Sequence, residues 1–145
     1  MIANERQYRI SQGQLRRFEE AIAAHDAREP RRGVDPRVHR AMREALASEA
    51  EELREQIGRY EDLKSGRVTE RTLDSLRELP TALIEARIAA NMTQKALAQR
   101  IGVPEQQVQR WEANRYAGVG VDRLQTVADA LRVRIRETVS YAPAA

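Results

Sequence analysis

The chain has 145 residues, of which 32% are charged and only 4% are aromatic, and it carries a formal net charge of +3 at pH 7. This length suits one ordinary domain or two small ones, with a core built mainly from Leu, Ile, Val and Ala. The sequence contains no Cys, which excludes disulfides, thiolate metal sites and a Cys nucleophile and is typical of a reducing cytoplasm. No apolar run approaches the roughly 18 residues that span a bilayer, so we expect a cytoplasmic protein without a membrane partner.

The excess positive charge lies in the second half of the chain. Residues 1–79 contain 16 basic and 16 acidic side chains, whereas residues 80–145 contain 9 and 6. This asymmetry suits a phosphate-bearing partner, although three charges are a weak signal by themselves.

The N-terminal segment, residues 1–10, is polar and is compatible with either a short strand or an ordered arm. Ser11 is predicted to cap a helix over residues 12–28. The apolar residues of this helix recur at helical spacing, which gives it one apolar and one charged face. They are Leu15, Phe18 and Ile22.

Pro30, Gly33 and Pro36 predict a turn, after which residues 37–64 form a longer helix rich in Glu and Arg. Its apolar residues step by 4, 3, 4 and 3, an a/d seam of about two heptads. They are Leu46, Ala50, Leu53, Ile57 and Tyr60. A seam this short does not secure a free-standing coiled coil. We therefore expect it to pack against the first helix as an antiparallel hairpin, or against its copy in a second chain; a solvated helix without a partner is the alternative.

Gly66 ends this helix, and the predicted domain boundary lies between residues 64 and 69. Thr69 is predicted to start a connecting helix that runs through Leu79. Pro80, which a helix tolerates in its first turn, is predicted to start the next one.

From there the pattern changes to short helices. The first covers residues 80–91, and Asn91 can adopt the left-handed conformation that ends it. Thr93 is predicted to cap the second helix and Gly102 to close it with a tight turn.

A third helix is predicted to begin at Pro104 or Glu105 and to reach Glu112. If Val108 points inward, a rotation of about 100° per residue brings Trp111 to the same side. Four residues then face outward: Gln106, Gln109, Arg110 and Ala113. In the major groove of DNA, Gln pairs bidentately with adenine and Arg with guanine, so this face carries the chemistry of base recognition.

The stretch from Leu83 to Val133 resembles the Xre family of helix-turn-helix regulators, which includes the phage Cro and lambda-type repressors. Four segments carry the resemblance: ARIAANMTQ (86–94), LAQRIGV (97–103), VQRWE (108–112) and LQTVADALRV (124–133). The resemblance implies a compact five-helix, lambda-repressor-like domain whose third helix enters the major groove.

The resemblance also implies roles for single residues. Gln94 falls at a phosphate-contacting position, and the base-contacting positions are those of Glu105, Gln106 and Arg110. Gln107 and Gln109 lie near the DNA backbone or the flanking bases. Arg87 and Glu112 match a structural ion pair that ties the first helix of the family's domain to the third.

Two departures from the family pattern bear on these roles. Pro104 stands where the family commonly has a Ser or Thr cap, so Glu105 can be turned away from the DNA. The segment at residues 114–120, NRYAGVG, differs from the usual shorter loop, and Asn114 and Arg115 are its candidate phosphate contacts.

The last segment, residues 132–141, alternates apolar and basic residues and predicts a strand. A lone strand needs a partner, and its copy in a second protomer is a simple one. We therefore predict a homodimer joined through this strand, the N-terminal helices or both. Such a dimer would place two recognition helices about one turn of DNA apart, roughly 34 Å, on a palindromic operator.

Taken together, the sequence predicts an all-α protein with a short C-terminal strand. Residues 1–66 form a helical hairpin or short coiled coil for oligomerisation or partner binding, 67–79 a connecting helix, 80–133 the helix-turn-helix domain and 134–145 the tail. The predicted function is a dimeric, nucleoid-associated repressor that binds double-stranded DNA sequence-specifically. The alternatives are a HigA-type antitoxin, whose residues 1–64 would cover a toxin, and an interaction module that does not bind DNA.

Enzymatic activity, a cofactor and a metal site are not expected. His25 and His39 lack the i, i+4 partner or carboxylate spacing of a metal site. No nucleophile–base pair is discernible, and no glycine-rich phosphate loop is present.

Overall fold

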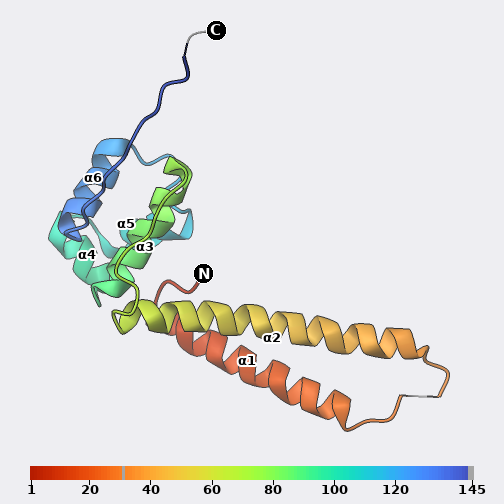
Figure 1. Ribbon diagram of the computed structural model, residues 1–145. Helices are drawn as coiled ribbons and strands as arrows, with labels where there is room; N and C mark the ends of the chain where they lie inside the picture. The colour runs from red at the N-terminus through yellow and green to blue at the C-terminus, as the bar shows by residue number, and fades with distance from the viewer. Residues whose placement is uncertain (31, 144–145) are drawn as a thin grey trace. The chain divides into compact units, whose positions relative to one another are not determined.

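A computed structural model describes residues 1–30 and 32–143 of the chain. These residues form six α-helices and one short 3-10 helix, and no strand occurs among them. The predicted all-α class is confirmed. None of these helices is long and apolar enough to cross a membrane. The chain divides into two compact units, Met1–Arg71 and Thr72–Ala145, which are described separately (Figure 1).

The first unit is an antiparallel helical hairpin. Helix α1 (Glu5–Asp26) and helix α2 (Pro36–Lys64) lie side by side along most of the length of α1 (Figure 1). The hairpin that the sequence predicted is therefore present. The side chain of Asp35 caps α2 by accepting a hydrogen bond from the Arg37 amide at 2.8 Å.

The start of α1 differs from the prediction. Residues 1–10 do not form a strand or an arm, because α1 begins at Glu5. Asn4 is the cap, and its Oδ1 accepts a hydrogen bond from the Gln7 amide at 2.9 Å. Ser11, the predicted cap, is buried inside the helix. A second polar cap upstream thus extends the helix by almost two turns.

Part of the apolar seam of α2 forms the hairpin core, whereas Leu46 and Leu53 of the seam are only half-buried. Ala50, Ile57 and Tyr60 are buried. The ring of Tyr60 stacks on that of Tyr8 in α1 with centroids 5.0 Å apart, and the Tyr8 hydroxyl donates a hydrogen bond to Glu61 at 2.6 Å. The polar N-terminal turns of α1 are thereby held on α2.

The hairpin also brings together two histidines that appeared isolated in the sequence. The rings of His25 and His39 lie with their centroids 3.9 Å apart, beside the ion pair of Asp26 with Arg43. No group of three metal-ligating side chains occurs among the described residues.

The predicted connecting helix over residues 67–79 is wrong. Residues 67–74 form neither helix nor strand, and only the 3-10 helix Leu76–Glu78 precedes α3. Ser75, not Thr69, supplies the cap, because its hydroxyl accepts a hydrogen bond from the Arg77 amide. Pro80 occupies the first turn of α3, and a continuous helix through it would lose the hydrogen bond that proline cannot donate.

The second unit contains four consecutive helices: α3 (Leu79–Ala89), α4 (Gln94–Ile101), α5 (Glu105–Ala113) and α6 (Val121–Ala130). The largest fully buried side chains of their core are aliphatic: Leu83, Ile84, Leu97, Val108 and Val127. Asn91 has a φ of 53°, the left-handed conformation expected between α3 and α4. The Thr93 hydroxyl accepts a hydrogen bond from the Ala96 amide at 3.0 Å, as the predicted cap requires.

The described residues of this unit contain four α-helices and a 3-10 helix, so one of the five expected helices is not an α-helix. The expected C-terminal strand is wrong. Residues 133–143 form no strand. A strand requires a neighbouring strand to satisfy its backbone groups, and the part of the chain that the structure describes offers none.

Candidate nucleic-acid interface

Helices α4 and α5 are joined by a tight turn. Gly102 ends α4 with a φ of 74°, and Pro104 is extended and immediately precedes α5. The inward sides of the two helices pack through Leu97, Ala98 and Val108, each at most 1% exposed. This packing leaves the opposite side of α5 free for a ligand.

The outward side of α5 carries a row of exposed polar residues. Gln106 and Arg110 lie four positions apart, on neighbouring turns of one face, and neither side chain has a hydrogen-bond partner among the described residues. Gln109 is also exposed, and its amide donates to the Glu105 carboxylate at 3.2 Å. Gln107 is half-buried. A free carboxamide and a free guanidinium on one helical face are the donor and acceptor sets that read adenine and guanine edges.

A buried ion pair anchors the inner side of α5. The Arg87 guanidinium of α3 donates to both carboxylate oxygens of Glu112, at 2.5 and 2.7 Å. It also donates to the backbone carbonyl of Met92 at 2.8 Å. The bidentate geometry fixes the rotation of α5 about its axis, and so decides which residues face outward.

Gln94, the first residue of α4, extends this network. Its side-chain amide donates to the Glu112 Oε2 at 2.7 Å, and the residue is half-buried. One of its two amide N–H donors is therefore used inside the fold. The predicted phosphate contact would have to use the other.

The segment after α5 turns sharply. Asn114 ends the helix, and Arg115 and Tyr116 both adopt left-handed backbone conformations, with φ of 50° and 54°. Asn114 and Arg115 are exposed at the end of the same helix that carries Gln106 and Arg110. The structure thus brings these predicted contacts to one end of the row.

Tyr116 is a core residue that the sequence did not reveal. It is 3% exposed, its ring lies 6.1 Å from that of Trp111, and its burial raises the pKa of its hydroxyl. Trp111 is half-buried, and the guanidinium of Arg123 lies 5.7 Å from the centre of its ring. The sequence NRYAGVG is typical of an exposed loop. The burial of Tyr116 accompanies the left-handed backbone conformations of Arg115 and Tyr116, which the sequence did not predict.

Residues 83–137 match the helix-turn-helix family model. The match begins within α3, includes α4, α5 and α6 and ends in the extended tail. Neither the curated proteins nor the solved structures gave a match to the chain. The helix-turn-helix part of the predicted resemblance is confirmed, and the match supports a DNA-binding domain of the kind found in transcription regulators. The HigA-type assignment stays a prediction.

Proposed function

We propose that this protein is a sequence-specific regulator that binds double-stranded DNA by inserting α5 into the major groove. The observation that carries the proposal is the pair Gln106 and Arg110. Both side chains are exposed and have no partner among residues 1–30 and 32–143, on a helix whose opposite side is fixed by Val108 and Glu112. Polar side chains that a fold leaves free on an anchored helix are positioned to bind an external partner.

In this proposal the residues divide by chemistry. Arg110 reads a guanine and Gln106 an adenine, and Gln109 and Glu105 adjust the flanking positions. A second group of residues contacts the phosphates of the DNA backbone through neutral or positively charged hydrogen-bond donors. Its members are Gln94, Gln107, Asn114 and Arg115.

A dimer follows from the size of the reading helix. With nine residues, α5 is about 13 Å long and can read only about four base pairs. Each base pair contributes about 1–3 kcal/mol of discrimination, too little to select one site in a genome. Two copies on a palindromic operator double the number of base pairs read. We infer a homodimeric repressor that acts on its operator in the cytoplasm, on the nucleoid.

The test is selection of bound duplexes from a random DNA library by the purified full chain at about 50 mM salt, where phosphate contacts are strongest. We expect enrichment of two inverted half-sites about one helical turn apart, and a mobility shift with the DNA upstream of the protein's own gene. Gln106→Ala/Arg110→Ala is the matched control, with its fold checked by Trp111 fluorescence. If no sequence is enriched, the proposal fails and a non-DNA-binding interaction module becomes the better interpretation.

A second candidate, an antitoxin, uses the same DNA chemistry. The observation that favours it is that the hairpin Met1–Arg71 forms a unit of its own, available for another protein. A toxin gene beside this one, or a toxin that co-purifies with the chain, would distinguish the antitoxin from a simple repressor.

A further inference from the structure

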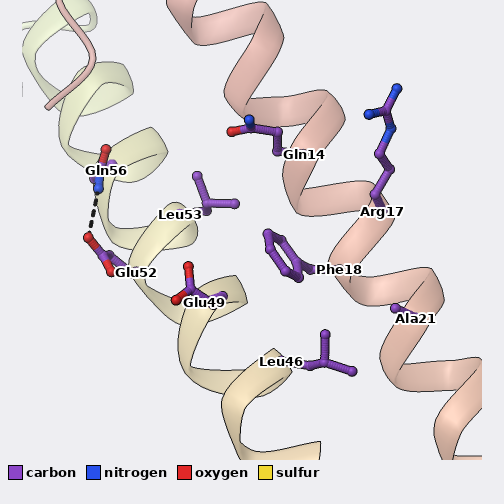
Figure 2. Close-up of a pocket in the computed structure, with 9 residues that line it drawn as sticks. All are labelled: Gln14, Arg17, Phe18, Ala21, Leu46, Glu49, Glu52, Leu53 and Gln56. Atoms are coloured by element: carbon purple, nitrogen blue, oxygen red, sulfur yellow. Dashed lines mark hydrogen bonds between the residues drawn. The ribbon is translucent and has the colours of Figure 1, made fainter. Parts of the chain in front are cut away.

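One side of the α1–α2 hairpin is not closed. A groove of about 590 Å³ runs between the two helices, and Phe18, Leu46 and Leu53 point into it while remaining only half-buried (Figure 2). Its other lining residues are Gln14, Arg17, Ala21, Glu49, Glu52 and Gln56. The hairpin thus leaves part of its apolar side chains in contact with water.

The apolar surface continues beyond the groove. Ile10 precedes the groove residue Gln14 by one helical turn, and Met42 precedes Leu46 in the same way. Val38 lies a further turn away. Ile10 and Val38 are each 52% exposed and Met42 is 58% exposed. Because helices in water derive most of their stability from packing an apolar face, a stripe this long on a two-helix unit calls for a partner.

The charges beside the groove indicate which partner. Arg17 projects from the α1 wall, and Glu49 and Glu52 project from the α2 wall (Figure 2). Arg17 and Glu49 form no ion pair within the described part of the chain. One wall is therefore basic and the other acidic, so the surface is electrostatically complementary to a second copy of itself.

Symmetry fixes how the copies would pack. If the two-fold axis runs parallel to the helices, α1 of one copy packs on α2 of the other without a shift along the helix axis. Arg17 of each copy then lies against Glu49 and Glu52 of the other, so the contact occurs twice. A two-fold axis across the helices would instead lay α1 on α1 and bring Arg17 towards its own copy. The distribution of charge selects the first arrangement.

We propose that two copies of the chain associate through this face into an antiparallel four-helix bundle, with Arg17 of each copy against Glu49 and Glu52 of the other. Helix α1 is about 33 Å long, and two adjacent helices about 10 Å wide present several hundred square ångströms, close to the roughly 800 Å² that each partner buries in a standard interface. The inference deepens the homodimer of the proposed function and rests on it for the need to dimerise, but it requires no DNA contact.

The test uses charge reversal in the full chain, followed by sedimentation equilibrium without DNA. Wild type is expected to be a dimer at tens of micromolar. Arg17→Glu and Glu49→Arg/Glu52→Arg should each weaken self-association at least about tenfold, because each opposes like charges at both symmetric contacts. An equimolar mixture of the two variants should regain the wild-type affinity as a heterodimer. Matched controls are Arg16→Glu and Glu44→Arg/Glu55→Arg, which reverse exposed charges on the outward sides of the same helices.

A monomeric wild type, reversals no more harmful than their controls, or a mixture that fails to associate would each overturn the inference. A monomer is also the outcome expected if another protein covers this face. DNA recognition is measured separately: Arg17→Glu leaves α5 intact, so its preference for half-site bases should match that of wild type. A dimer without sequence preference would contradict the proposed function and leave the interface standing.

Discussion

Arg87 and Glu112 form an ion pair that is almost completely removed from solvent, with side chains 3% and 1% exposed. Two parallel hydrogen bonds join the guanidinium to the carboxylate, and they connect α3 to the helix that carries the candidate base contacts. A buried pair of this kind is neutral as a unit, but either charge alone would be strongly unfavourable.

We therefore expect Arg87→Met to lower the free energy of unfolding by about 3–5 kcal/mol, because it leaves the Glu112 carboxylate buried without its cation. The double variant Arg87→Met/Glu112→Leu removes both charges and should lose less than the single variant. Trp111 is the only tryptophan of the chain and adjoins Glu112, so urea unfolding followed by its fluorescence reports on this unit.

The matched control for this prediction is an exposed ion pair. Arg54 bridges Glu19 at 2.9 Å, but its side chain is 45% exposed. Arg54→Met also removes the exposed contact with Glu51, yet it should lower the free energy of unfolding much less than Arg87→Met, measured by circular dichroism. Equal losses for the two arginine variants would show that burial does not govern the Arg87–Glu112 pair.

Gln94 offers a test that separates a structural role from a DNA contact. Its amide donates to the Glu112 carboxylate, so Gln94→Glu would place two carboxylates in contact. At pH 7 we expect Gln94→Glu to be less stable than Gln94→Ala. The two carboxylates repel each other inside the fold, whereas an Ala side chain adds no charge there. Wild-type stability for both variants, with weakened DNA binding, would assign Gln94 to the phosphate alone.

Replacement of glycine by alanine is expected to change stability in opposite directions at Gly102 and Gly58. A Cβ added at Gly102 or Gly58 meets no atom within 4 Å, so only the backbone decides. Gly102 has a φ of 74°, and Gly102→Ala should destabilise the second unit by about 1–2 kcal/mol. Gly58 lies inside α2, and Gly58→Ala should stabilise the hairpin by about 1 kcal/mol. Thermal unfolding of each variant, followed by Trp111 fluorescence and by circular dichroism respectively, should give shifts of opposite sign; shifts of the same sign would refute the backbone explanation.

The features that the sequence predicted correctly depend on neighbouring residues. Thr93 caps α4 and Gly102 closes it because each acts on atoms within one turn of itself. The outward exposure of Gln106 and Arg110 follows in the same way from helical periodicity and the inward position of Val108. Local rules are sufficient for such features.

The features that were missed depend on residues far apart in the chain. Helix α1 is capped by Asn4 instead of Ser11 partly because Tyr8 stacks on Tyr60, which lies more than fifty positions later. The register of the hairpin likewise decides that His25 meets His39. The members of each pair lie in different helices, so helical periodicity does not relate them.

Tyr8 predicts how the hairpin responds to alkaline pH. The hydrogen bond from its hydroxyl to Glu61 raises the pKa of Tyr8 from 10.0 to about 12. Because the folded-state pKa lies above the unfolded one, the stabilisation is complete below about pH 10 and is lost as pH rises towards 12. The difference in thermal midpoint between wild type and Tyr8→Phe should therefore shrink over this interval, in circular dichroism scans at successive pH values. If the difference in thermal midpoint stays constant up to pH 12, the hydrogen bond to Glu61 does not raise the pKa of the Tyr8 hydroxyl.

Two arginines of the candidate interface are expected to contact different parts of the DNA. Arg110 faces outward from the middle of the exposed row, whereas Arg115 lies beyond the end of α5. Arg110→Ala should cost about 1–3 kcal/mol at a single base position and relax the preference there. Arg115→Ala should weaken all sequences equally and reduce the salt dependence of binding by about one phosphate contact. Competition binding with operator variants at several salt concentrations measures both effects. If Arg110→Ala weakens the binding of all sequences equally, Arg110 contacts a phosphate instead of a base. Gln106 would then be the principal base contact, because it is the other exposed and unpaired side chain of the row.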